Sequence, residues 1–192
     1  MYEAFAFIAC CNALAFGPRS LLVVTGLPFA AACLGILYVV GLLPSSMYAH
    51  GAPDAWHVCH LTLLVDAVQF WLHALEHRLH FRSHALHHAK TRPTCLDAFR
   101  TGFGDATVQL IVPLCGALHC VRPNKTTAVM FGAFYASWLQ WIHCDRDWAL
   151  RVRSNVFVTP HSHRRHHLRP TSNLGHVFVA WDRLYGSADE SE

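Results

Sequence analysis

The chain has few charged residues, and this scarcity is the most informative feature of its composition. Only 14% of its 192 residues are charged, whereas 53% are hydrophobic. A typical soluble domain has about 25% charged residues. The segment Leu21–Leu43 contains no charged residue and is long enough to cross a bilayer. The sequence therefore predicts an integral membrane protein. A net charge of only +3 also gives no reason to expect a nucleic-acid partner.

Several common chemical motifs are also missing. The eight cysteines include no Cys-x-x-Cys pair and lie mostly in apolar runs, so we interpret them as buried thiols rather than a disulfide framework or zinc finger. The His-Glu-x-x-His motif of zinc proteases is absent, as are a glycine-rich nucleotide-binding loop and a haem-attachment sequence. A redox activity in this chain is therefore expected to take its electrons from a separate partner.

Three further apolar segments follow the first one. They are Trp56–Trp71, Phe103–Val121 and Thr126–Ile142, and the last two flank a short turn. Both members of this hairpin are marginal in length, and Pro113 would kink the first of them. We predict an all-α membrane protein with about four transmembrane or half-spanning helices.

The basic residues predict the orientation of these segments. The loop Pro44–Ala55 has no Lys or Arg, whereas both histidine-bearing segments contain several. These segments and Arg19 are expected on the side of the membrane opposite to that loop. The positive-inside rule places that side, a helical cap carrying the histidines, in the cytoplasm. We expect a single domain with a membrane anchor (1–55, including an interfacial segment Met1–Phe16), a core (56–186) and a tail (187–192).

Histidine is abundant, with six of the 16 histidines lying between His73 and His88. A straight helix would place these two residues about 22 Å apart, yet an imidazole–metal bond is only about 2 Å long. Either the histidines form two distant sites or the chain bends between two clusters. Ser83, a plausible N-cap of a second helix just before His84, favours a bend. The bend separates a His-x3-His pair from a His-x2-His-His group.

The later part of the chain repeats the His-x2-His-His pattern, and His143 ends the fourth apolar segment. We predict nine metal ligands from these places: His73, His77, His84, His87, His88, His143, His163, His166 and His167. Nine imidazoles are too many for one ion and suit two ions with open positions. Ligand type alone allows Fe, Zn, Cu or Ni.

Three other side chains are candidates to support these ligands. Asp66 is costly within a membrane unless it is paired, and we predict that it accepts the free ring N–H of a ligand histidine. Asp182 has the same predicted role or forms a surface cap beside Arg183. His80 shares the helical face of the ligands and is either a ligand or a supporting residue, whereas His176 is not predicted to be a ligand.

These motifs together resemble the fatty acid hydroxylase/sterol desaturase superfamily of integral-membrane di-iron enzymes. The resemblance runs from Asp66 to Gly186 and includes the three histidine motifs, the "TP-x-x-His-x-x-His-His" element from Thr159, and "WDRLYG" from Trp181. The chain departs from the family where "RTGFGD" lacks the usual His and Pro, with Asp105 in place of Glu. It also has Asp147 where some members have a histidine; a carboxylate there is either a ligand or solvated.

The resemblance implies an O2-dependent enzyme with two iron ions that hydroxylates or desaturates an unactivated C–H bond of a membrane lipid of fatty acyl, sphingoid or sterol type. It also implies an external electron donor, a b-type cytochrome or ferredoxin with a reductase. The expected location is the endoplasmic reticulum membrane in a eukaryote or the inner membrane in a bacterium. A membrane metal-binding or transport protein, or an inactive lipid-binding relative, is the alternative.

Overall fold

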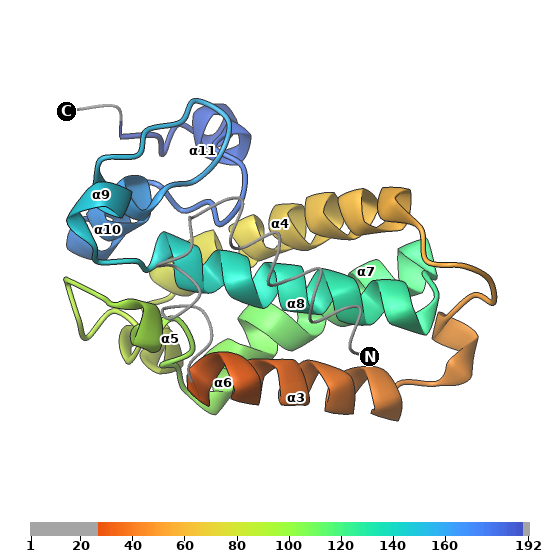
Figure 1. Ribbon diagram of the computed structural model, residues 1–192. Coiled ribbons are helices and arrows are strands. Elements are labelled where there is room, and N and C mark those ends of the chain that lie inside the picture. The colour runs from red at the N-terminus through yellow and green to blue at the C-terminus, as the bar shows by residue number, and fades with distance from the viewer. Residues whose placement is uncertain (1–26, 190–192) are drawn as a thin grey trace.

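The computed structural model describes residues 27–189, and within this range the fold is helical, with no strand. The prediction of an all-α fold is thus confirmed for the described residues. The long helices are α3 (Leu27–Leu42), α4 (Ala55–Arg78), α7 (Val112–Val121) and α8 (Lys125–Ile142). They lie alongside one another, and four short helices gather near one end, namely α5 (Arg82–Ala85), α9 (Asp147–Leu150), α10 (Pro160–Leu168) and α11 (Ala180–Tyr185) (Figure 1).

Polar residues at two helix ends explain where α4 and α8 begin. The Asp54 side chain accepts a hydrogen bond from the backbone N–H of Trp56, and the Asn124 side chain accepts one from Thr127. Each cap satisfies a donor that a helix N-terminus leaves free. Helix α8 then packs on α3 at Gly132, where a Cβ atom would lie 2.5 Å from Ile36 Cγ2.

Pro113 shapes the stretch from 103 to 121 without ending it. This stretch consists of α6 (Phe103–Ala106), a π-helical turn η3 (Thr107–Ile111) and α7. Because proline has no N–H, it cannot bond the carbonyl of Gln109 four residues before it. That carbonyl instead accepts a hydrogen bond from Gln69 Nε2 at 2.8 Å. The predicted kink therefore takes the form of a π-helical turn that ties this stretch to α4.

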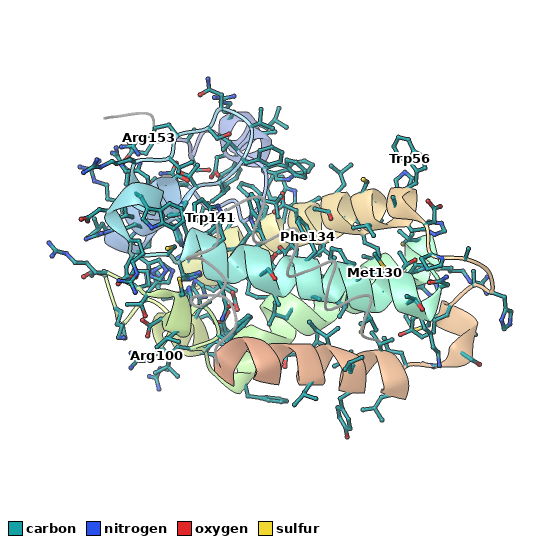
Figure 2. All side chains as sticks on the ribbon, in the orientation of Figure 1. Trp56, Arg100, Met130, Phe134, Trp141 and Arg153 are labelled. Carbon is teal, nitrogen blue, oxygen red and sulfur yellow. The ribbon has the colours of Figure 1, made fainter. Side chains whose placement is uncertain are left out.

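Two described stretches, Ala55–Arg78 and Phe103–Val121, are long and apolar enough to cross a membrane. Large apolar side chains remain exposed on both, including Phe103 and, at the far end of α4, Trp56 (Figure 2). The predicted span Leu21–Leu43 begins before the described residues and continues as α3. Met1–Phe16 and Arg19 lie outside the described residues. Four spans therefore stay a prediction.

The predicted bend after His77 is present, but its details differ from the prediction. Helix α4 ends at Arg78, His80 takes a left-handed conformation with φ of 51°, and the short helix α5 (Arg82–Ala85) follows. The predicted N-cap is wrong, because Phe81 occupies that position. Ser83 Oγ instead accepts a hydrogen bond from the backbone N–H of Asp105 at 2.9 Å.

The short elements complete the histidine-bearing end of the molecule. They are η2 (Cys95–Asp97), α9 (Asp147–Leu150), α10 (Pro160–Leu168) and α11 (Ala180–Tyr185), while η1 (Ser45–Met47) lies at the other end of α3. Thr159 and Ser162 form a capping box at the start of α10, with Pro160 at its first position. The sequence thus fixes the start of the helix that carries the last three predicted ligands.

Candidate metal centre

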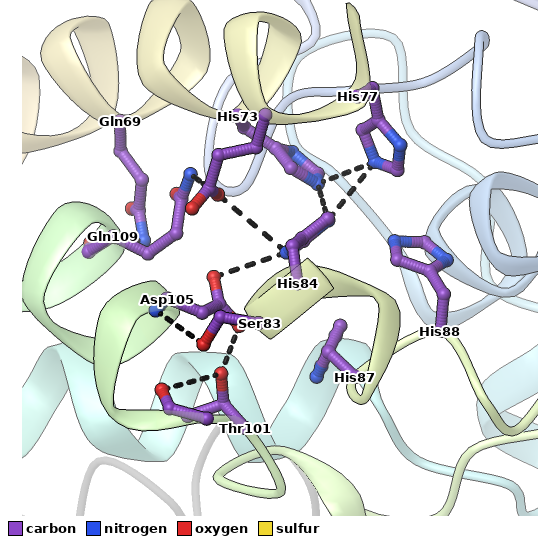
Figure 3. A network of polar contacts seen from close by, with 12 residues as sticks. Gln69, His73, His77, Ser83, His84, His87, His88, Thr101, Asp105 and Gln109 are labelled. Atoms are coloured by element: carbon purple, nitrogen blue, oxygen red, sulfur yellow. Dashed lines mark hydrogen bonds and ion pairs between the residues drawn. The ribbon is translucent and has the colours of Figure 1, made fainter. Parts of the chain in front are cut away.

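The nine predicted ligand histidines fall into two groups, each converging on its own centre. The first cluster contains His73, His77, His84, His88 and His166, and the second contains His87, His143, His163 and His167. Figure 3 shows the rings of His73, His77 and His84 directed toward one another. The bend after α4 makes this convergence possible, because it folds His84 and His88 back toward the end of α4. Metal binding by these residues stays a prediction, now with a definite geometry.

The Nε2 atoms within each cluster are closely spaced. In the first cluster the Nε2–Nε2 distances are 3.1 Å for His73–His84, 3.1 Å for His77–His73, 3.3 Å for His77–His166 and 3.1 Å for His166–His88. In the second they are 3.2 Å for His143–His87 and 3.0 Å for His163–His143. Two nitrogens bonded to one ion at about 2.0–2.1 Å, with angles from square to tetrahedral, lie about 2.9–3.4 Å apart. The spacing therefore fits one ion per cluster.

The second ring nitrogen, Nδ1, is held by an oxygen acceptor in six of the nine histidines. The acceptors are Leu174 O for His73, Asp105 Oδ1 for His84, Arg100 O for His87, Leu139 O for His143, Ser172 O for His166 and Lys90 O for His167. An oxygen acceptor requires the proton on Nδ1, so Nε2 carries a lone pair. Lone pairs facing each other at about 3 Å repel unless a cation lies between them. This arrangement is the one that ligand histidines use.

Burial keeps these imidazoles neutral. Burial, followed by the neighbouring His87, lowers the pKa of His167 from its ordinary value of 6.5 to about 3. Burial, followed by other histidines, also holds the pKa values of His163 and His166 well below the ordinary value. A neutral imidazole is the form that binds a metal. At neutral pH these three imidazoles therefore present lone pairs without first having to lose protons.

Asp66 supports the site, but not through the predicted partner. Its fully buried carboxylate accepts hydrogen bonds from Val177 N (2.8 Å), Phe178 N (3.0 Å) and Trp181 Nε1 (2.9 Å). The prediction that it accepts a ring N–H from a ligand histidine is wrong, because these three donors occupy it. Asp66 instead anchors the segment that follows His176 to the middle of α4.

Asp182 supports His73 indirectly, through the backbone of Leu174. Its buried carboxylate accepts hydrogen bonds from Leu174 N (2.6 Å), Gly175 N (2.9 Å) and Ser187 Oγ (2.6 Å). Leu174 then offers its carbonyl oxygen to His73 Nδ1 at 2.7 Å. The predicted alternative of a surface cap is wrong, because only 2% of Asp182 is exposed. The "WDRLYG" motif, which contains Asp182, thus helps to orient His73.

A buried polar network that the sequence reasoning missed surrounds His84. Asp105 accepts hydrogen bonds from His84 Nδ1 at 3.1 Å and from Thr101 Oγ1. Glu76 Oε2 lies 3.6 Å from His84 Nδ1 and accepts a hydrogen bond from Gln109 Nε2. The one available signal was the presence of Glu76 and Gln109 within apolar helical segments, where polar side chains are costly without partners.

Two residues considered in the sequence do not reach the clusters. His80 is exposed in its left-handed turn, and Asp147 is exposed at the start of α9. The structure therefore gives no support for a ligand role of either residue. His176 is buried, and its ring centroid lies 4.7 Å from that of His73. It belongs to neither cluster.

Two adjoining cavities approach the clusters. A cavity of about 220 Å³ is lined by polar groups that include His84, His87, His143 and His176. A larger cavity of about 440 Å³ is bounded by apolar side chains of α3, α7 and α8. Both are lined by Phe99, Ala106, Leu110 and Leu139. An apolar molecule in the larger cavity therefore has a direct approach to the histidines.

Comparison with known proteins gives a consistent match. Residues 58–187 match the family model described as fatty acid hydroxylase. The chain is 32% identical over 162 residues to an alternative squalene epoxidase from Phaeodactylum tricornutum, covering 80% of this chain and 47% of that protein. It is 28% identical over 152 residues to an ornithine lipid hydroxylase from Rhizobium tropici, covering 74% of this chain and 46% of that protein.

A very-long-chain aldehyde decarbonylase from Oryza sativa subsp. indica is 24% identical over 139 residues, which cover 66% of this chain and 22% of that protein. The chain therefore spans about half or less of the length of these curated relatives. No solved structure matches the chain.

Proposed function

Because the chain belongs to the fatty acid hydroxylase family, we propose that it is a membrane-bound oxidoreductase that hydroxylates or desaturates an unactivated C–H bond of a lipid. The observation that carries this proposal is the pairing of two histidine clusters with a cavity that adjoins a larger apolar one. Relatives named as a lipid hydroxylase, an epoxidase and an aldehyde decarbonylase support a lipid substrate.

We assign one iron ion to each cluster. All nine donors are imidazole nitrogens, which suit iron as well as zinc, and oxidation of a C–H bond requires a metal that changes its redox state. When bound, the two ions would supply activation of O2 with electrons from outside the chain. The chain itself supplies neutral donors at the right spacing, and the oxygen acceptors at Nδ1 hold the rings in place.

The apolar cavity is the proposed binding site for the substrate's hydrocarbon chain. Its walls include Ile36 of α3, Leu114 of α7 and Phe131 of α8. Burying apolar surface there favours a lipid tail over water. Phe99 and Ala106, which line both cavities, would then help to place one part of that tail beside the histidines.

The membrane setting of this proposal rests on the exposed apolar side chains. Leu63, Val68 and Trp71 lie on the outer side of α4 with 41–56% of their surfaces exposed, and Phe103 is 87% exposed. Such side chains favour contact with lipid. We propose one membrane-embedded unit with residues 1–55 as anchor and 56–186 as catalytic core. The histidine-bearing end would face the cytoplasm, in the endoplasmic reticulum or bacterial inner membrane.

The external electron donor has a candidate contact surface on the cap. A polar groove of about 510 Å³ includes Arg153, Arg183 and His161 in its lining, together with the buried carboxylate of Asp182 and that of Asp189, which is paired with Arg165 and Arg169. Its wall also contains Ser162, the residue before His163 on α10. We propose that an acidic carrier, a b-type cytochrome or ferredoxin with its reductase, binds at this surface, because opposite charge favours encounter.

A metal transporter is the alternative from another class. Transport requires ligands spaced along a path through the membrane, whereas the convergent metal-binding groups of residues 27–189 all include or adjoin the two clusters. An inactive lipid-binding relative would have no use for the oriented Nε2 lone pairs. Both alternatives predict no O2 consumption.

The deciding experiment uses the full chain purified in detergent, loaded with iron, and supplied with a reductase, an electron carrier and extracted membrane lipids. We expect O2 consumption together with a lipid product that has gained an oxygen atom or lost a pair of hydrogen atoms. A His143→Ala variant should show neither. O2 consumption without any lipid product, or activity that the variant retains, would contradict the proposal.

A further inference from the structure

His176 lies between the two histidine clusters although it belongs to neither. Its ring is buried, with centroid distances of 4.7 Å to His73 of the first cluster and 6.2 Å to His163 of the second. The ring forms part of the wall of the 220 Å³ cavity, as do His84 and His143. A molecule in that cavity would therefore contact ligands of both clusters and His176 at once.

Contacts from two helices and one loop fix the backbone at His176 and Val177. Its carbonyl oxygen accepts a hydrogen bond from Trp138 Nε1 of α8 at 2.7 Å. The next residue, Val177, donates its N–H to Asp66 of α4 at 2.8 Å, and its carbonyl accepts from Val158 N at 2.8 Å. The ring itself is different: Nδ1 is buried and has no hydrogen-bond partner among residues 27–189. A buried polar atom without a partner requires an explanation.

The other polar donor groups of the cavity wall each make a hydrogen bond within the protein, although the amide groups of Gln69 and Gln109 each retain a second N–H. Gln69 Nε2 donates to Gln109 O, and Thr101 Oγ1 donates to Asp105. Gln109 Nε2 donates to Glu76. Nδ1 of His84, His87 and His143 is held by Asp105 Oδ1, Arg100 O and Leu139 O, respectively. Among the four histidines of the wall, His176 is thus the one whose Nδ1 has no hydrogen-bond partner within residues 27–189.

We propose that His176 binds a small ligand in the cavity between the clusters by a hydrogen bond from its imidazole ring, and is not a tenth metal ligand. Its ring nitrogens belong to neither set of converging nitrogens. The ligand class is a molecule of two or three atoms with an acceptor atom, such as O2 or an anion of similar size. The inference rests on the proposed function, because that ligand is held jointly with the two ions.

The test uses the iron-loaded full chain and azide as the probe. Azide affinity is measured from the charge-transfer absorption that azide gives on binding iron, and iron per chain is measured on the same samples. In His176→Ala we expect iron content equal to wild type and an azide Kd raised about tenfold, the size of one lost hydrogen bond. His176→Gln, which retains an N–H, should recover part of the affinity. His57→Ala, at a half-buried histidine in the first turn of α4 and outside both clusters, is the matched control.

Two results would overturn the inference. One is an unchanged azide Kd in His176→Ala, which would make the ring merely structural. The other is a loss of iron in both His176→Ala and His176→Gln, which would make His176 a metal ligand or a residue needed for folding. If His176→Ala alone fails to load iron, the azide Kd of His176→Gln decides. A wild-type chain that binds no iron would instead refute the proposed function.

Discussion

Replacing Asp105 by asparagine tests how the protein orients a ligand of the first cluster. The carboxylate is 4% exposed, and its Oδ1 accepts the hydrogen bond from His84 Nδ1 at 3.1 Å. A carboxylate only accepts, so it keeps the proton on Nδ1 and the lone pair on Nε2, which faces His73 and His77. Asparagine has nearly the same shape, but its amide can donate to Nδ1 and so place the proton on Nε2.

The size of the effect follows from the place of His84 in the structure. Removing the hydrogen-bonded partner of a ligand histidine typically weakens metal binding by about 10–100-fold, which is about 1.4–2.8 kcal/mol. His84 belongs to the first cluster and not to the second. Asp105→Asn should therefore weaken the binding of one of the two ions by about that factor and leave the binding of the other unchanged.

Chelator competition on the iron-loaded chain measures this difference. The expected removal curve has two phases in Asp105→Asn, with one ion lost at a lower chelator concentration than in wild type. Asp147→Asn is the control, because Asp147 is an exposed carboxylate outside both clusters. If the binding of both ions were weakened equally, or the binding of neither, the assigned role of Asp105 would be refuted.

Three further predictions follow from other contacts. Asp66→Asn should lower the free energy of unfolding by about 2–4 kcal/mol, because three N–H groups lose a charged acceptor; an unchanged denaturation midpoint would contradict this. The metal-free chain should lose stability as pH falls from 6.5 toward 3, because the pKa of His167 is about 3 when folded and 6.5 when unfolded. The unfolded state then binds more protons than the folded state, so the free energy of unfolding falls by roughly 1.4 kcal/mol per pH unit for each such ring. Denaturation measured at successive pH values checks that stability falls with pH. Ala106→Phe should fill the junction of the two cavities, abolishing lipid oxidation with iron content unchanged; retained turnover would show that the substrate enters elsewhere.

The convergence of the histidines was predictable because metal bonds are short. A straight helix through His73 and His88 cannot bring both residues to one ion, so the sequence left a choice between two distant sites and a bend, and the chain bends. Which residue caps the next helix was not predictable from local rules. Ser83 is a favoured N-cap residue, yet its hydroxyl is used by Asp105, 22 positions away in the sequence.

The assignment of each ligand histidine to one of the two clusters could not be predicted from the sequence and came from the structure. His87 and His88 are neighbours in the sequence but belong to different clusters, as do His166 and His167. His166 and His167 are adjacent on α10, where neighbouring side chains point about 100° apart, whereas His87 and His88 lie in the turn after α5. In both pairs the direction of each ring depends on packing against other parts of the chain. The partners of Asp66 were missed for the same reason, since they lie 111 to 115 residues after it in the sequence.

The most direct test of the two-cluster assignment is the metal content of the purified chain, compared with one variant in each cluster. We expect about two irons per chain in wild type, and about one in His166→Ala and in His163→Ala, with the chelator resistance of the remaining ion unchanged. A single zinc per chain, or the loss of both ions from either single variant, would contradict two independent iron sites.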